Sequence, residues 1–247
     1  MLPIWVLTLL FGVSTVGAQA QQRVPILLYH NIAQQYENPL LHVSKEQFAA
    51  HMDALQQAGY QSITYADFLD AGNCDGCNLP EKPILLTFDD GYLSVYSDAF
   101  PILRERNMQA TVFVITDRMG MQTGEFPHFS WEQAAEMEHS GVMAIESHTH
   151  SHPDCSSISE AEFVWEAQTA KAEIESHLRK PCRVFAYPFG LESPYASQLS
   201  KAGYTAVNLV GDKGTNLPSN GAWRLKRLTV RGDLTPQQLL DMIQNEY

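Results

Sequence analysis

The sequence is poor in positive charge. Of its 247 residues, 16 are Lys or Arg and 28 are Asp or Glu, so the formal net charge is −12. Because proteins bind the nucleic-acid backbone mainly through Lys and Arg, this balance argues against general nucleic-acid binding. Residues 21–247 also lack internal repeats, low-complexity tracts and a long linker. We therefore expect this region to form one domain.

The sequence also lacks an apolar run long enough to span a bilayer comfortably. The longest stretch, Leu2 to Val16, is followed by the small residues of Ala18-Gln19-Ala20 and then by polar residues. This pattern is typical of a secretory signal peptide, although no Lys or Arg precedes the apolar stretch. We expect residues 1–20 to be cleaved, leaving a periplasmic or extracellular protein without stable membrane insertion. An uncleaved anchor is the alternative.

Cysteine is scarce, with four residues in the chain. An even number in an exported protein indicates disulfides. Cys74 and Cys77 lie in a loop rich in Gly, Asn and Asp, whereas Cys155 and Cys182 are isolated, which disfavours a four-thiolate zinc site. We expect the pairs Cys74–Cys77 and Cys155–Cys182.

Short apolar runs alternate with helical patterns along the chain. This alternation predicts parallel βαβ units, and their number favours a closed, distorted (β/α)7-8 barrel. Functional residues in such a barrel gather at the carboxyl ends of the strands. Strands are expected at 24–29, 61–64, 83–88, 110–115, 142–146, 184–187, 205–209 and 225–230, and helices at 44–59, 93–106, 130–140, 159–178 and from 235 onward.

Two groups of polar residues follow predicted strands. Asp89 and Asp90 end the strand at 83–88, and His148, His150 and His152 follow the strand at 142–146. An Asp-Asp-Gly segment alone is more often a turn, and a single His is more often structural. Three histidines in five residues favour a metal site, and two His with one carboxylate leave positions open for metal-assisted hydrolysis. A zinc peptidase is disfavoured because the pattern lacks the Glu of His-Glu-x-x-His.

Together, these motifs resemble those of a known enzyme family. Thr87-Phe88-Asp89-Asp90-Gly91 and His148-Thr149-x-x-His152 are similar to the first two motifs of the NodB-type polysaccharide deacetylases, carbohydrate esterase family 4. The resemblance implies a barrel of the NodB homology type over residues 21–247. It also implies that Asp89 is the general base, while Asp90, His148 and His152 bind a divalent metal. Zinc suits this ligand set, with cobalt, nickel or iron as alternatives.

A third segment also matches the family. Ala186-Tyr187-Pro188-Phe189-Gly190 resembles the motif that lines the sugar groove, where the backbone N–H of Phe189 would help hold the oxyanion. A strand followed by a Pro-Gly turn is the simpler interpretation. We expect substrate contacts from four residues: Tyr187, Pro188, Phe189 and His150.

The sequence departs from the family pattern at two positions. Most members carry an Arg that orients the base where this chain has Ala186, and Arg183, Arg224 and Arg227 remain open as replacements. The late Leu-x-x-His that supplies the usual general acid is absent, since no His follows His177.

His30, at the end of the first predicted strand, is the expected replacement for that acid. In this respect the sequence resembles the circularly permuted branch that deacetylates biofilm exopolysaccharide of the poly-β-1,6-N-acetylglucosamine type. A structural histidine is the alternative.

The resemblance implies a hydrolase that removes N-acetyl groups from an N-acetylated polysaccharide and releases acetate. The expected substrate contains N-acetylglucosamine and is of the poly-β-1,6-linked type. Peptidoglycan or chitin oligosaccharides are alternative substrates. A catalytically weak carbohydrate-binding homologue is an alternative of a different class.

Overall fold

The structure is a computed structural model that describes residues 22–33, 39, 41–74, 77–122, 126–211 and 216–246. The expected signal peptide, residues 1–20, lies outside the described residues. Within the described part of the chain, no helix combines the length and apolar character needed to cross a membrane.

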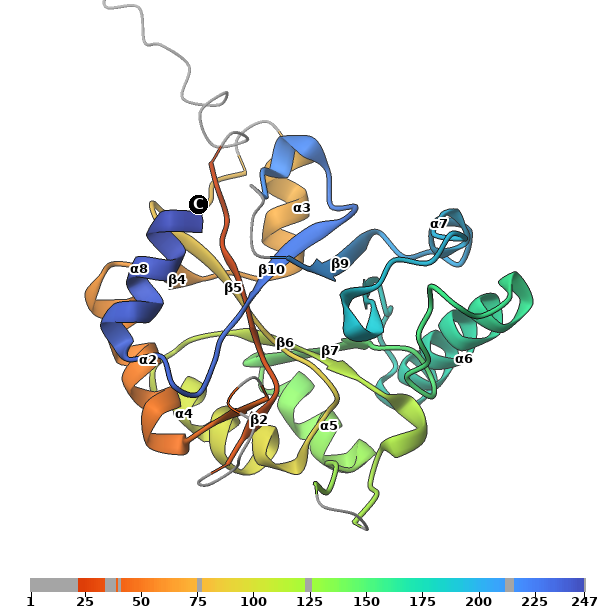
Figure 1. Ribbon diagram of the computed structural model, residues 1–247, viewed down its shortest axis with the longest axis horizontal. Coiled ribbons are helices and arrows are strands. Elements are labelled where there is room, and N and C mark those ends of the chain that lie inside the picture. The colour runs from red at the N-terminus through yellow and green to blue at the C-terminus, as the bar shows by residue number, and fades with distance from the viewer. Residues whose placement is uncertain are drawn as a thin grey trace, which may run out of the picture.

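A closed parallel barrel forms the centre of the molecule (Figure 1). The strand order is β1-β10-β9-β8-β7-β6-β5-β4, and the sheet closes because β1 also pairs with β5. Seven strands make the closed ring. The remaining strand, β4, pairs with the beginning of β5. The strands are β1 (Ile26–Tyr29), β4 (Gln61–Ser62), β5 (Pro83–Phe88), β6 (Ala110–Val114), β7 (Met143–Ser147), β8 (Val184–Ala186), β9 (Ala206–Val210) and β10 (Leu225–Thr229). The expected barrel is confirmed.

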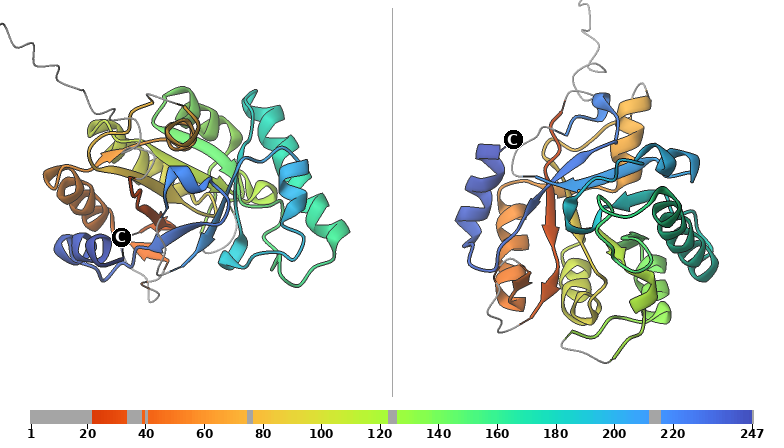
Figure 2. Two further views of the ribbon diagram at one scale, coloured as in Figure 1. Left: turned by 90° about the horizontal axis from the view of Figure 1, so that it is seen from above. Right: turned by 45° about the vertical axis from the view of Figure 1, so that its right-hand side comes forward.

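Helices surround the barrel on the outside (Figure 2). The first and last of those described, α2 and α8, pack against each other beside β1 (Figure 1). A separate two-stranded pair, β2 (Asn31–Ile32) and β3 (His42–Val43), follows β1. The helices are α2 (Lys45–Gln57), α3 (Tyr65–Asn73), α4 (Phe100–Glu105), α5 (Trp131–His139), α6 (Glu160–Leu178), α7 (Ser197–Lys201) and α8 (Pro236–Glu246), with short turns η1 (Val95–Ala99), η2 (Thr116–Arg118), η3 (Pro188–Gly190) and η4 (Pro218–Asn220).

Capping side chains explain where several helices begin. Ser130 and Ser159 each accept a hydrogen bond from the backbone N–H three residues on, and each donates its own backbone N–H to the side chain of that residue, as their capping-box patterns predict. Thr64 and Asp67 make the same arrangement at α3, a helix that the predicted elements omitted. Ser44 caps α2, but the Gln47 side chain turns away to the carbonyl of Leu234.

The predicted helix at 93–106 is divided in two. A π-helical turn, η1, precedes α4, which begins with Pro101 in its first turn. Because proline has no N–H to donate, the regular hydrogen-bond ladder cannot run through this position.

Side chains along the barrel strands alternate between two buried clusters. Leu86 and Phe88 of β5 belong to the larger core between barrel and helices, whereas Leu85 belongs to a smaller cluster with Phe113. This period of two places Thr87 and Asp89 on the same face as Leu85, toward the barrel interior. Leu225 and Arg227 of β10 share the interior face for the same reason.

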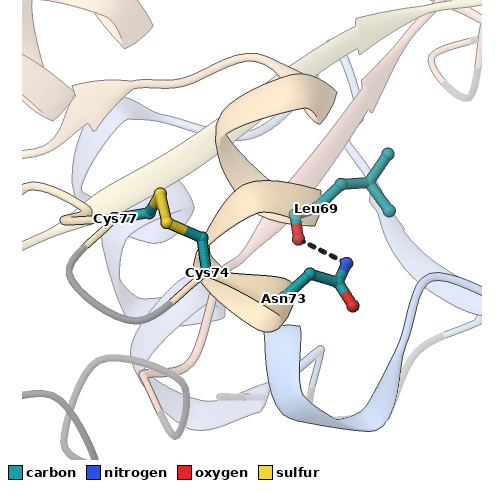
Figure 3. Close-up of a disulfide and its surroundings, with 4 residues drawn as sticks. All are labelled: Leu69, Asn73, Cys74 and Cys77. Atoms are coloured by element: carbon teal, nitrogen blue, oxygen red, sulfur yellow. Dashed lines mark hydrogen bonds between the residues drawn. A yellow bond between two sulfur atoms is a disulfide. The ribbon is translucent and has the colours of Figure 1, made fainter.

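The structure contains one of the two expected disulfides. Cys74 and Cys77 are bonded, with their Cα atoms 5.5 Å apart, where the chain leaves α3 (Figure 3). The Asn73 side chain next to this bond donates to the carbonyl of Leu69 at 2.7 Å. The disulfide therefore ties Cys77 to the C-terminal end of α3.

The expected Cys155–Cys182 disulfide is wrong, because both cysteines are buried free thiols. They lie beside different parts of α6. Burial and the nearby Glu166 raise the pKa of Cys155 to about 12, whereas the N–H of Cys182 donates to Glu175 at 3.0 Å. Those two glutamates are about 13 Å apart along the helix axis, and a disulfide requires Cα atoms within about 7 Å.

Candidate active site

One large cavity opens at the carboxyl ends of the strands. Its volume is about 820 Å³, and its wall combines polar residues from the ends of β1, β5 and β7 with apolar residues from β9, β10 and α8. Among the residues expected to be functional, the wall includes His30, Asp89, Asp90, His148, His152 and Phe189. The barrel therefore brings together residues that are up to about 160 positions apart in the sequence.

Asp90, His148 and His152 form a group that could bind a metal ion. The Nε2 atoms of His148 and His152 lie 3.6 and 3.5 Å from Oδ1 of Asp90, and one ligand atom from each residue lies within 4.8 Å of the others. Two ligands of a tetrahedral zinc, each bound at about 2.1 Å, are about 3.4 Å apart. The spacing of the three side chains therefore fits a small divalent cation.

A backbone carbonyl fixes the tautomer of His148. Nδ1 of His148 lies 2.8 Å from the carbonyl oxygen of Ala186 and donates to it. Nε2 therefore carries no proton, and its lone pair faces Asp90. Position 186, where most members of the family carry Arg, thus contributes to the site through its main chain.

The backbone around these residues adopts an uncommon conformation. Asp90, Thr149, His152 and Phe189 have φ angles of 71°, 70°, 65° and 58°. The left-handed region costs a residue other than glycine about 1 kcal/mol or more, so the surrounding structure has to hold these positions. Thr149 does so locally, because its Oγ1 accepts a hydrogen bond from the N–H of His152 at 2.9 Å.

Arg227 is the guanidinium that pairs with Asp89. Its Nη1 and Nη2 donate to the two carboxylate oxygens at 2.6 and 2.8 Å, and the side chain is fully buried. The other two candidates lie elsewhere: Arg224 pairs with Glu192 at 3.2 Å, and Arg183 is exposed. The structure thus settles the question that the sequence left open.

This pairing controls the charge of Asp89. Burial raises the pKa of a carboxyl group, but the charge and hydrogen bonds of Arg227 outweigh burial and hold the pKa of Asp89 at about 2. Asp89 is therefore a carboxylate at neutral pH, and its oxygens lie on the wall of the cavity.

His30 follows β1 and also lines the cavity. Its Nδ1 is buried and makes no hydrogen bond with any described residue. Burial lowers the pKa of His30, while the charges of Asp89 and Asp90 oppose that effect. His30 thus lies at the cavity with its imidazole close enough to both aspartates to interact with their charges.

The third motif divides into a buried part and an exposed part. Tyr187 is fully buried, with its ring stacked on Phe163 at 6.0 Å, and Pro188 is buried beside it. Phe189 is 63 % exposed and meets the ring of His152 edge-on at 4.7 Å. Of these expected substrate contacts, Phe189 lines the cavity, whereas Tyr187 and Pro188 lie behind its wall.

The turn after Phe189 requires glycine. Gly190 has a φ of +69°, and a Cβ added to it would lie 2.5 Å from Cβ of Val210. This close approach holds the loop of the third motif against β9.

His150 points away from the cavity wall. Its Nδ1 lies 3.1 Å from the carboxylate of Glu173 and 3.0 Å from the hydroxyl of Thr116, and its ring contacts Trp165. These contacts are of a structural kind, and the described wall does not include His150.

Comparison with known proteins places this site in a family. Residues 77–207, just over half of the chain, match the family described as polysaccharide deacetylase. The chain belongs to the polysaccharide deacetylase family. It is accordingly a hydrolase of the N-acetyl amide bond, as expected.

Individual relatives agree with this assignment. The deacetylase is 31 % identical to YxkH of Bacillus subtilis, a protein named as a polysaccharide deacetylase, over 84 % of this chain and 71 % of that one. It is 24 % identical to a poly-β-1,6-N-acetyl-D-glucosamine N-deacetylase of Staphylococcus aureus, over 77 % of this chain and 68 % of that one.

A solved structure confirms the fold. The deacetylase PplD of Streptococcus pyogenes, solved in complex with acetate, superposes with a TM-score of 0.80 at 25 % identity, covering 90 % of this chain and 98 % of that one. The resemblance inferred from the motifs is therefore confirmed at the level of family and barrel.

Two further residues on the cavity wall of the deacetylase were not among those predicted from the sequence. Tyr92 follows the Asp-Asp-Gly turn, and Arg118 ends η2 after β6. Each lies four residues beyond the end of a strand, Tyr92 after β5 and Arg118 after β6, so position near a strand end was the signal available to find them.

Proposed function

We propose that this deacetylase removes N-acetyl groups from an exopolysaccharide of the poly-β-1,6-N-acetylglucosamine type. The observation that carries the proposal is the meeting of the Asp90–His148–His152 group and the Asp89–Arg227 pair on the wall of one cavity. The similarity to the Staphylococcus aureus enzymes supports the choice of polymer. The His at the end of β1, in place of a late His, supports it as well.

Asp90, His148 and His152 would hold a divalent metal, and zinc is the proposed ion because two imidazoles and one carboxylate suit it. When bound, such an ion polarises the acetamide carbonyl and acidifies a water molecule beside it. Cobalt, nickel and iron are the alternatives that metal analysis would distinguish.

Asp89 is the proposed general base. Its low pKa keeps it ionised, and it lies beside the metal-binding group, with Oδ2 3.6 Å from Nε2 of His148. It would accept the proton of the attacking water as the new C–O bond forms. Arg227 holds both carboxylate oxygens and so fixes the direction from which Asp89 meets that water.

Phe189 is the proposed donor to the oxyanion. Its backbone N–H makes no hydrogen bond among the described residues, and its left-handed conformation sets it at the cavity wall. A preorganised main-chain donor of this kind stabilises the charge that develops on the carbonyl oxygen.

His30 is the proposed general acid. The amine leaves poorly unless its nitrogen is protonated, and His30 lines the same cavity as Asp89. Because burial lowers its pKa, protonated His30 is a stronger acid than a free imidazolium. Proton transfer to nitrogen completes the cleavage and gives acetate and a glucosamine residue.

We also propose that the protein acts outside the cytoplasm. The Cys74–Cys77 disulfide requires an oxidising compartment to persist. The apolar segment and small residues at 2–20 would direct export.

Acetate release from purified polymers tests the proposal. Poly-β-1,6-N-acetylglucosamine, peptidoglycan and chitin oligosaccharides are compared, each with zinc, with a chelator, and with zinc restored after chelation. We expect release from the first polymer, loss of release with chelator, and recovery with zinc. Faster release from peptidoglycan or chitin would reject the proposed polymer, and no release from any glycan would reject the enzyme.

A further inference from the structure

Arg118 lies on the cavity wall but has no place in the reaction proposed above. It is the last residue of η2, the short turn that follows β6, and its side chain is half-buried. It therefore presents a positive charge to the same cavity as the metal-binding group.

The guanidinium of Arg118 has no carboxylate within 4.0 Å in the part of the chain that the structure describes. Other arginines are paired: Arg106 with Asp53, Arg227 with Asp89, and Arg231 with Asp233. Arg231 shares the cavity wall, but Asp233 occupies its guanidinium. A half-buried cation without a partner has lost part of its hydration. The free energy of that loss is not offset until an anionic ligand binds.

The residues around Arg118 do not supply that compensation. Tyr92 and His128 pack ring against ring at 5.1 Å, and Nε2 of His128 is buried without a hydrogen-bond partner among the described residues. Burial and then the charge of Arg118 lower the pKa of His128, so this imidazole stays neutral. Of the nearby carboxylates, Asp90 belongs to the metal-binding group, and Asp117 interacts with the charge of Arg118 without forming an ion pair within 4.0 Å.

We propose that Arg118 binds a carboxylate carried by the glycan on a sugar next to the one that is deacetylated. This inference rests on the proposed function and limits the natural polymer to one whose N-acetylglucosamine backbone also carries acidic substituents. A guanidinium fork matches the two oxygens of a carboxylate. A monoanion is favoured over a dianion because the overall charge of −12 repels additional negative charge.

A matched pair of substrates tests the proposal. The first is an N-acetylglucosamine trisaccharide in which one terminal sugar carries a carboxylate in place of its primary hydroxyl, and the second is the methyl ester of that trisaccharide. The readout is the ratio of kcat/KM for acid over ester, measured with the zinc-loaded protein. For the wild type, we expect a ratio of about ten to one hundred, the range for one hydrogen-bonded charge pair.

Three variants separate the charge from the fold. Arg118→Gln should bring the ratio to about one, and Arg118→Lys should retain part of the preference because it keeps the charge but loses the fork. Arg104→Gln is the control, since Arg104 is an exposed cation over the ring of Phe100 and lies outside the cavity. It should leave the ratio unchanged.

Several results would overturn the proposal. One is a wild-type ratio near one, or a ratio that Arg118→Gln does not alter. Another is an equal loss of rate on both substrates with less bound zinc, which would mean that Arg118 serves the metal ligands. A third is weaker inhibition by acetate in Arg118→Gln at an unchanged ratio, which would mean that Arg118 holds the product.

Calorimetric titration with the same trisaccharides separates this proposal from the function on which it rests. If neither compound is deacetylated, the proposed function fails. Tighter binding of the acid than the ester, lost in Arg118→Gln, would still support the carboxylate site, and equal binding would reject it.

Discussion

Asp89 and Glu146 are both buried carboxylates that pair with a cation, but they use their oxygens differently. Glu146 accepts from the backbone N–H groups of Arg183 and Val184 at 2.8 and 2.7 Å, and its other oxygen accepts from Lys180 at 3.1 Å. These bonds satisfy the backbone N–H groups at the start of β8, where the strands β7 and β8 are paired at one position, Ser147 with Phe185.

Asp89 receives its hydrogen bonds from a single side chain, Arg227, and its oxygens remain on the wall of a cavity. Burial and charge are thus common to both carboxylates and do not distinguish the site. What distinguishes it is that its polar atoms face space that a substrate can enter. The predictions below test this difference, beginning with the largest effect.

Removing the charge of Asp89 should have the largest effect on turnover. For Asp89→Asn we expect kcat to fall by about 10²–10⁴-fold, the usual contribution of a general base. Acetate release under saturating substrate measures it. Glu146→Gln is the matched control, and a comparable loss of kcat in that variant would contradict the distinction between the two carboxylates.

Removing Arg227 should have the largest effect on stability. Arg227→Met leaves Asp89 buried without its partner, which typically costs about 3–5 kcal/mol. Denaturant unfolding measures the loss. In the double variant with Asp89→Asn, part of the stability should return, because no uncompensated charge remains. Strictly additive losses would show that the pair is not coupled.

Glu146→Gln should lower stability without affecting turnover. The amide presents an N–H group to Lys180 or to the backbone donors of β8, so at least one hydrogen bond to the former carboxylate is lost. We expect a loss of about 1–3 kcal/mol. Urea unfolding and kcat measured on the same preparation decide it, and a changed KM would assign Glu146 to the site.

The smallest effect should appear at alkaline pH. Burial lowers the pKa of Lys180, but Glu146 and Glu138 outweigh burial and raise it above 10.5. A cation with a raised pKa contributes stability that is present below the unfolded pKa and is lost as the pH rises through the folded value. The stability difference between wild type and Lys180→Met should therefore shrink above about pH 10.5. A constant difference up to pH 12 would contradict this account.

The sequence alone predicted the barrel and the residues at its strand ends. Asp89, Asp90, His148 and His152 could be found because each follows a strand directly, and parallel strands place their carboxyl ends together. The partner of Asp89 could not be chosen in the same way. Its choice depends on the register that sets Leu28 of β1 opposite Thr87 of β5 and Thr229 of β10, which local patterns do not encode.

Other errors have equally specific causes. Helix α3 was omitted: the residue three positions after Thr64 is Asp67, not the Glu or Gln of the usual capping-box pattern. The Cys155–Cys182 pair was inferred from an even number of cysteines, and that number says nothing about the distance between two of them in the fold. The expected substrate contact of Tyr187 stays a prediction: its side chain lies in the core between barrel and helices, on the opposite face from Ala186.

The double pairing of β1 has a consequence for how the active site is made. This first strand pairs with β5 on one side and with β10 on the other. Its second neighbour is synthesised about 200 residues later. His30 at the end of β1 and Arg227 on β10 can take their places only after nearly the entire chain has emerged from the ribosome. Asp90, His148 and His152 all lie between these two strands in sequence. A partly synthesised chain would therefore contain all three residues before β10 could pair with β1 and close the barrel. If the chain is exported unfolded, as we propose, Asp89, His30 and the Asp90–His148–His152 group come together in one step after it crosses the membrane.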